Sequence, residues 1–137
     1  MLDDVFSRRA DEFAMDPGLE RAWGLLVGGG GRSRVADVAD DVGWSRRHLV
    51  NKFAAEFGVT PKDSARIARF SASHAILRRT EIPSLAEIAV DCGYYDQAHM
   101  AREWRELAGM APSVWRAKEV FAFVQASASD EDRDWSA

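Results

Sequence analysis

Arginine side chains occur at helical spacing in two stretches of the sequence, accompanied by an asparagine in the first stretch and a glutamine in the second. In the first stretch, Leu49 and Phe53 lie four residues apart, a spacing that predicts the inward face of a helix. A step of about 100° per residue then turns Arg47 and Asn51 outward. In the major groove of DNA, arginine can pair with two acceptors of guanine, and asparagine can pair with adenine. The pattern therefore favours recognition of base edges.

The second stretch repeats this arrangement with Met100 and Trp104 as the inward residues. Its outward residues include a histidine and two arginines, and a glutamine lies in the first turn, the part of a recognition helix nearest to base edges. We predict that the base-reading residues are Arg47, Asn51, Gln97, His99 and Arg102. We predict contacts with the DNA backbone for Ser45, Arg46, Lys52, Asp96 and Arg105. The simpler alternative for each charged residue is a solvated surface position.

The two stretches occupy equivalent positions in an internal sequence repeat. The matching pairs are Val38 with Ile88, Ala39 with Ala89, Gly43 with Gly93, Leu49 with Met100, Phe53 with Trp104, Gly58 with Gly109 and Pro61 with Pro112. An apolar-Ala pair, a glycine four residues later and two apolar anchors four apart are typical of a helix-turn-helix. Ser45 and Asp96 then stand where each copy needs a cap for its second helix. The generic alternative is a pair of helical hairpins without a ligand.

The remaining segments predict helices around the two copies. Asp16-Pro17 opens a helix with an apolar stripe that ends at the glycine run 28–31. We interpret this run as a flexible joint, because it lacks the lysine and hydroxyl of a phosphate-binding loop. Residues 62–80 contain no proline or glycine and predict one long connecting helix. Residues 2–15 predict a short amphipathic helix.

These elements predict an all-α fold in which two helix-turn-helix subdomains are joined by a long connecting helix. We expect about seven helices plus an extra N-terminal helix. The predicted divisions are an N-terminal helix and linker (1–16), a DNA-binding domain (17–118) and a partly disordered C-terminal tail (119–137). Within the domain, we place the helix-turn-helix units at about 34–55 and 84–107 and the connecting helix at about 62–80.

Composition narrows the class of protein. Of 137 residues, 47% are hydrophobic and 29% charged, a balance that favours a globular domain over disorder. There is no apolar run of membrane-spanning length. A single cysteine, Cys92, excludes an internal disulfide framework, so we expect the protein in a reducing cytoplasm. The three histidines lie far apart, without metal-ligand spacing. We therefore predict no enzyme, no metal site and no cofactor.

Charge is distributed unevenly along the chain. The net charge of −4 divides into −3 for residues 1–31, +3 for residues 32–118 and −4 for residues 119–137. The mildly basic middle coincides with the repeat, which suits an anionic partner. However, a net charge of only +3 is small for a DNA-binding domain. It therefore also supports an alternative, a helical protein-interaction module that has lost DNA binding. A steep salt dependence of binding to DNA would separate the two.

Residues 93–116, Gly-Tyr-Tyr-Asp-Gln-Ala-His-Met-Ala-Arg-Glu-Trp-Arg-Glu-Leu-Ala-Gly-Met-Ala-Pro-Ser-Val-Trp-Arg, resemble the C-terminal signature of AraC/XylS-type transcriptional regulators. The resemblance covers about residues 17–118. The departures from the family pattern are Ala98 for Ser, Met100 and Trp104 for Phe, Trp115 for Tyr, Asn51 for Arg and Ser64 for an aromatic residue.

This resemblance implies a monomeric arm that reads two adjacent major grooves of double-stranded DNA. It implies RNA polymerase subunits as further partners, and no membrane. Family members usually carry a ligand-sensing or dimerisation domain before this arm, so an effector would bind a domain absent from this chain. The segment 2–15 is then either the last helix of such a domain or the first helix of a short regulator.

Overall fold

The computed structural model describes residues 14–135, with side chains described as far as residue 129. Within this range the chain is helical and contains no strand, as the sequence predicts. The elements are α2 (Pro17–Trp23), η1 (Gly24–Gly28, a π-helical turn), α3 (Val35–Val42), α4 (Arg46–Phe57), α5 (Pro61–Leu77), α6 (Leu85–Asp91), α7 (Gln97–Ala108) and α8 (Pro112–Trp135). The helix predicted within residues 2–15 falls outside the described residues, except for its last two positions.

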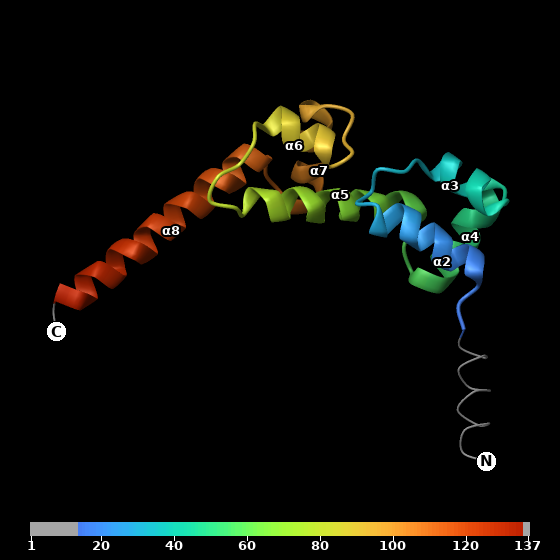
Figure 1. Ribbon diagram of the computed structural model, residues 1–137, viewed down its shortest axis with the longest axis horizontal. Coiled ribbons are helices and arrows are strands. Elements are labelled where there is room, and N and C mark those ends of the chain that lie inside the picture. Colours follow the sequence, from blue (N-terminus) through green and yellow to red (C-terminus); the bar gives the residue numbers. More distant parts are fainter. Residues whose placement is uncertain (1–13, 136–137) are drawn as a thin grey trace, which may run out of the picture.

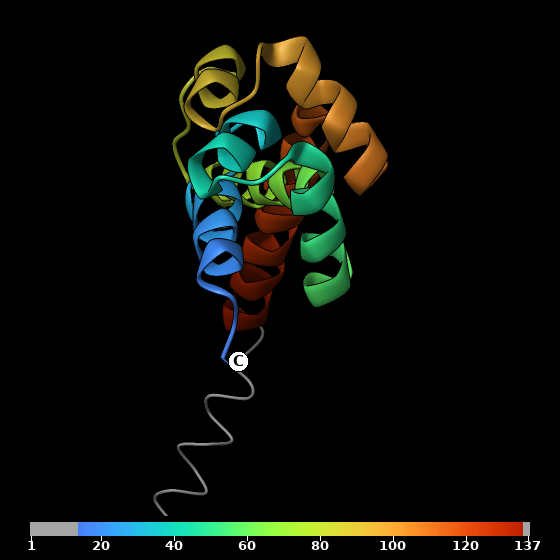
Figure 2. The same ribbon diagram turned by 90° about the vertical axis from the view of Figure 1, so that its right-hand side faces the viewer.

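Two helix-turn-helix units lie at opposite ends of α5. Figure 1 shows α3 and α4 near the start of α5, and α6 and α7 near its end. Seen along α5, the second helices of both units, α4 and α7, lie on the same side of the molecule, whereas α2 lies on the other side (Figure 2). The connecting helix therefore presents both predicted recognition helices in one direction.

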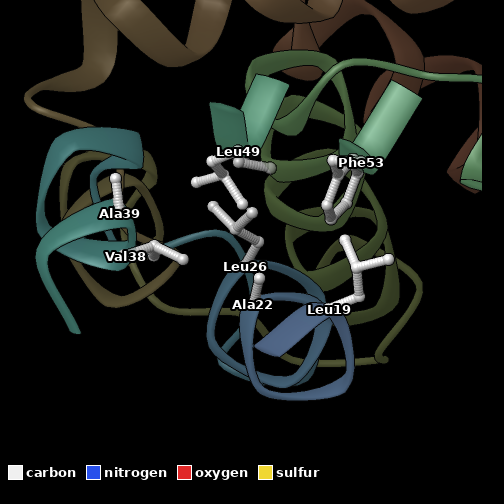
Figure 3. Packing of buried hydrophobic residues seen from close by; sticks show 8 residues of the cluster. Leu19, Ala22, Leu26, Val38, Ala39, Leu49 and Phe53 are labelled. Atoms are coloured by element: carbon white, nitrogen blue, oxygen red, sulfur yellow. The ribbon is translucent and has the colours of Figure 1, made fainter. Parts of the chain in front are cut away.

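The first core is formed by apolar residues of α2, η1, α3, α4 and α5. Figure 3 shows residues of α2 and η1 meeting those of α3 and α4. The buried members are Leu19, Ala22, Leu26, Val38, Ala39, Leu49, Phe53 and Ala65. Leu49 and Phe53 are fully buried, as the repeat predicts, so the rest of α4 can face solvent. Trp23 and Phe57 extend this core as an aromatic pair with ring centroids 4.6 Å apart.

The second core has the same plan at the other end of α5. Its buried members are Leu77, Ile88, Ala89, Cys92, Tyr94, Met100 and Trp104. The indole Nε1 of Trp104 donates to Ser73 Oγ at 2.9 Å, so the polar edge of this buried ring is satisfied. Met100 and Trp104 are fully buried, which confirms the inward face predicted for α7.

The helix ends explain where the recognition helices begin. Ser45 accepts a hydrogen bond from the backbone N–H of His48, and Asp96 accepts one from His99, as expected of N-caps. Ser84 and Glu87 form the predicted capping box at the start of α6. Arg34 occupies the equivalent position before α3 without a side-chain cap, as its sequence position suggests.

The connecting helix is shorter than predicted at its C-terminal end. It spans Pro61–Leu77 instead of 62–80, and Thr60 caps its start. The guanidinium of Arg116, on α8, donates to the backbone carbonyls of Leu77, Arg79 and Thr80. The Leu77 carbonyl belongs to the last turn of α5, and those of Arg79 and Thr80 lie just beyond it, where no helical N–H can reach them. Arg116 thus satisfies the backbone carbonyls at and just after the C-terminal end of α5.

The glycine run is more constrained than the predicted flexible joint. Gly31 is buried and has φ +78°, and a Cβ there would lie 2.2 Å from the carbonyl oxygen of Ala65. Arg69 Nη1 donates to Gly31 O at 2.8 Å. Close approach to α5 and a left-handed backbone together require glycine here. The end of the run is therefore fastened to the connecting helix.

The segment predicted as a partly disordered tail is helical in the structure. Helix α8 continues from Pro112 to Trp135 and extends away from the rest of the molecule (Figure 1). Residues 119–129 contain no proline or glycine, the two residues that most strongly disfavour a helix. None of the helices in the described range combines the length and apolar character needed to cross a bilayer.

Candidate nucleic-acid interface

The outward face of α4 carries the two strongest base-reading candidates. Arg47 and Asn51 are both exposed, one helical turn apart. Within the described range, neither side chain makes an intramolecular hydrogen bond or ion pair. His48, also on this helix, packs edge-on against the Trp44 ring at 5.0 Å between centroids. The donors of Arg47 and Asn51 are therefore free to meet a ligand.

The outward face of α7 carries Gln97, Ala98 and Arg102, all of them exposed. Glu106 lies four residues after Arg102 on the same helix, but its carboxylate pairs with Arg66 on the connecting helix. Among the described residues, Arg102 has no ion-pair partner. Its guanidinium therefore remains available, and α7 lies on the same side of the molecule as α4, the helix that carries Arg47 (Figure 2).

His99 differs from the other base-reading candidates because its ring is held within the protein. Its Nδ1 accepts a hydrogen bond from the backbone N–H of Tyr95 at 3.0 Å, and its Nε2 lies 3.0 Å from Glu103 Oε1. The side chain is only 28% exposed. With both ring nitrogens engaged, His99 would have to break a hydrogen bond to contact a base.

A buried charge cluster explains why His99 is held. Glu103 is 8% exposed on its side chain and pairs with Arg69 at 2.7 Å, and Arg66 lies 3.9 Å away. Burying a carboxylate is costly unless it is paired and hydrogen-bonded, and this one has both arginines and His99 around it. Sequence reasoning missed this cluster. Glu103 occupies the position that Lys52 has in the first copy, 51 residues earlier, but the repeat does not show that Arg69 pairs with it.

The predicted backbone-contact residues fall into two groups. Ser45, Arg46 and Arg105 are exposed, and the Ser45 hydroxyl can still donate its hydrogen while accepting from His48. Lys52 Nζ lies 2.9 Å from Asp16 Oδ2 and 4.8 Å from the centroid of the Trp44 ring, so it already has a structural role. Asp96 is an ionised acceptor with no hydrogen to offer a phosphate, and the structure gives it the role of a helix cap.

The loop after the glycine run connects the two units directly. Arg32 Nη2 donates to the backbone carbonyl of Asp91, at the end of α6. Gly93 follows with φ +87°, and a Cβ there would lie 3.0 Å from Arg32 Cα. A side chain at this position would strain the backbone and push the loop away. The first unit's loop therefore helps to set the position of the second unit.

Two buried groups near α7 have altered acidity. Burial raises the pKa of the Cys92 thiol, which suits a small core side chain and not a nucleophile. Burial also raises the pKa of Tyr94 to about 12. Among the buried side-chain atoms in the described range, only the Tyr94 hydroxyl has no hydrogen-bond partner.

Comparison with known proteins agrees with this geometry. A family model described as "Helix-turn-helix domain" matches residues 38–118, which is more than half of the chain. This range contains both helix-turn-helix units and the connecting helix between them. No curated protein matches the sequence.

Several solved structures share the fold. The DNA-binding domain of AdpA, solved in complex with a target DNA, has a TM-score of 0.67 at 21% identity, covering 75% of this chain and 93% of that one. The C-terminal domain of AraT, a response regulator from Geobacillus stearothermophilus, has a TM-score of 0.69 at 22% identity, with 75% and 86% covered.

A transcriptional regulator with an AraC-type DNA-binding domain, from Chromobacterium violaceum, has a TM-score of 0.62 at 26% identity, with 75% and 92% covered. The resemblance found in residues 93–116 is thus confirmed by the family model and by the fold. The chain belongs to the AraC-type helix-turn-helix family, whose members are DNA-binding transcription regulators and not enzymes.

Proposed function

We propose that the protein recognises a specific duplex sequence by inserting α4 and α7 into two adjacent major grooves. The observation that carries this proposal is the common orientation of the two helices on one side of α5 (Figure 2). Recognition helices reach successive major grooves when they lie about 34 Å apart, one turn of DNA. The DNA-binding domain of AdpA, which has the same fold, was solved in complex with a target DNA, and this supports DNA as the ligand.

We assign the exposed polar residues to two kinds of DNA contact, one with base edges and one with backbone phosphates. Arg47, Asn51, Gln97 and Arg102 read base edges, because they are exposed and their donors are not used within the protein. His99 contributes only where DNA displaces its bond to Glu103 or Tyr95. Ser45, Arg46, Arg105 and Lys52 contact phosphates, with Lys52 sharing its charge with Asp16.

The first experiment identifies the duplex and measures how binding depends on salt. Sequences selected from a random DNA pool by the purified chain should share a motif that spans about two helical turns. Affinity for this duplex should fall steeply with salt, because phosphate contacts release counterions. A chain that shows neither enrichment nor salt dependence would contradict the proposal and favour a protein-interaction module.

A matched pair of arginine variants separates recognition from charge. Arg47→Ala and Arg21→Ala both remove one positive charge, but Arg21 lies on α2, on the side away from α4 and α7, and pairs with Asp41. We expect Arg47→Ala to weaken binding to the selected duplex and Arg21→Ala to leave it nearly unchanged. Equal losses would mean that net charge alone accounts for binding.

Further partners follow from the role of a regulator. RNA polymerase subunits are the partner through which DNA-bound protein would alter transcription. Recruitment of purified polymerase to the selected duplex, with and without this protein, tests this point. Unchanged polymerase occupancy would contradict it.

A further inference from the structure

Helix α8 has one side that faces the rest of the protein and one that faces away. Arg116 binds the carbonyls at the end of α5, and Glu119, Val120 and Phe123 line a hollow with Arg78 and Arg79. These residues mark the inner side of the helix. Because an α-helix turns about 100° per residue, Phe121 lies on the opposite side from Phe123.

The outer side of α8 is apolar, which is unusual for a helix face turned to solvent. Its apolar residues follow alternating steps of three and four positions: Val114, Ala117, Phe121, Val124 and Ala128. We call these five residues the α8 seam. All five are exposed, with Phe121 63% and Val124 58% accessible. This spacing is the heptad pattern by which helices pair in coiled coils.

Charge narrows the choice of partner for the α8 seam. Residues 119–137 carry a net charge of −4, whereas residues 32–118 carry +3. An acidic segment disfavours docking on DNA or on an anionic membrane surface. A parallel pair of α8 helices would place two acidic segments side by side. An antiparallel pair would place each acidic segment beside the start of α8 in the other copy, next to the mildly basic domain of that copy, where the charges attract.

We propose that the α8 seam is a dimerisation surface that binds the α8 seam of a second copy in antiparallel orientation. The interface is isologous, since each seam meets the same seam of its partner. The extension of α8 away from the domain (Figure 1) leaves this outer side open along the helix. Dimerisation through α8 would link two DNA-binding domains without using α4 or α7.

The oligomeric state of the intact chain tests the seam. Mass from sedimentation or light scattering, followed from micromolar to millimolar concentration, should rise toward twice that of one chain. Phe121→Asp places a charge in the middle of the seam and should keep the protein monomeric. Phe123→Asp is the matched control: it makes the same change two residues later, on the inner side, at a position 74% exposed. It should dimerise as the unaltered protein does.

Two results would overturn the proposal. One is a monomer at every concentration, which would leave the seam to a different partner. The other is an equal loss of dimer in Phe121→Asp and Phe123→Asp. Circular dichroism of both variants checks that helix content is retained, so that loss of dimer is not loss of the helix.

Cross-linking tests the orientation independently. Ala117→Cys and Ala128→Cys place thiols near opposite ends of the seam and each add only one heavy atom. In an antiparallel pair, a mixture of the two variants should form a disulfide-linked dimer on mild oxidation, and each variant alone should not. Cys92 is buried in the second core and is present in every sample. Efficient cross-linking of each variant with itself would indicate parallel pairing and contradict the proposal.

Discussion

The two helix-turn-helix units are copies of one sequence repeat, but different contacts hold their recognition helices in place. Lys52 in α4 and Glu103 in α7 occupy matching positions of the repeat, and each forms an ion pair with another helix or its cap. The Lys52 pair with Asp16 is exposed, at 38% and 39% of the two side chains. The Glu103 pair with Arg69 is nearly buried, at 8% and 13%.

This difference shows that one fold can position a recognition helix by apolar packing or by buried charge. Helix α4 rests on the aromatic group of Phe53, Phe57 and Trp23, and its ion pair lies at the edge. Helix α7 also depends on Glu103, which joins it to α5. The cost of the second solution is that His99 is drawn into the cluster, which leaves Gln97 and Arg102 as the free base-reading groups of α7.

The largest difference should appear in stability. Arg69→Met leaves Glu103 with a weaker set of partners in a buried site, and we expect a loss of about 3 kcal/mol in the free energy of unfolding. Lys52→Met makes the same substitution in the exposed pair and should cost less than about 1 kcal/mol. Denaturant unfolding of both variants measures the contrast. Equal losses would mean that burial does not make the ion pair of Arg69 and Glu103 more important for stability than the exposed pair of Lys52 and Asp16.

The next effect concerns base recognition by the two helices. Arg47→Ala should cost roughly 1–3 kcal/mol in binding free energy and relax the base preference at one position of the selected duplex. Arg102→Ala should do the same at a position about one turn away. Titration of single-base variants of the duplex locates each effect, and thermal unfolding of the free proteins controls for stability. If either substitution weakened every sequence alike, that arginine would be a phosphate contact.

The sequence predicted the frame of the fold and the outward residues better than it predicted their interactions. The repeat identified both inward faces because Leu49, Phe53, Met100 and Trp104 follow helical spacing, which is local information. The engagement of His99 and Glu103 depends on Arg69, which is 34 residues from Glu103, so no local pattern reveals it. The end of α5 likewise depends on Arg116, and the constraint on Gly31 depends on Ala65.

A smaller effect is expected in the pH dependence of folding stability, through the exposed ion pair of Lys52 and Asp16. The hydrogen bond from Lys52 holds the pKa of Asp16 below its usual value, so this carboxylate stabilises the folded state above the unfolded pKa of about 3.9. The contribution is lost as the pH falls through the lower folded pKa. Asp16→Asn keeps a good helix cap but no titrating group. We expect the melting temperature of this variant to fall less on acidification below about pH 4 than that of the unaltered protein; an identical fall would contradict the assignment.

The smallest effect is expected at Tyr94, behind α7. Its buried hydroxyl has no hydrogen-bond partner among the described residues, so Tyr94→Phe removes a desolvated polar group and no hydrogen bond. We expect the free energy of unfolding to be unchanged or slightly higher. Ser73→Ala is the contrasting control, because it removes the acceptor of the Trp104 indole. A clear loss of stability in Tyr94→Phe would show that its hydroxyl does make a bond.

The most direct test of the central claim is a hydroxyl-radical footprint on the selected duplex. If α4 and α7 enter adjacent major grooves, the protein should protect two clusters on one face of the DNA, about one helical turn apart. Arg47→Ala should weaken protection of one cluster first, and Arg102→Ala that of the other. A single protected cluster that both substitutions weaken equally would contradict recognition by two helices.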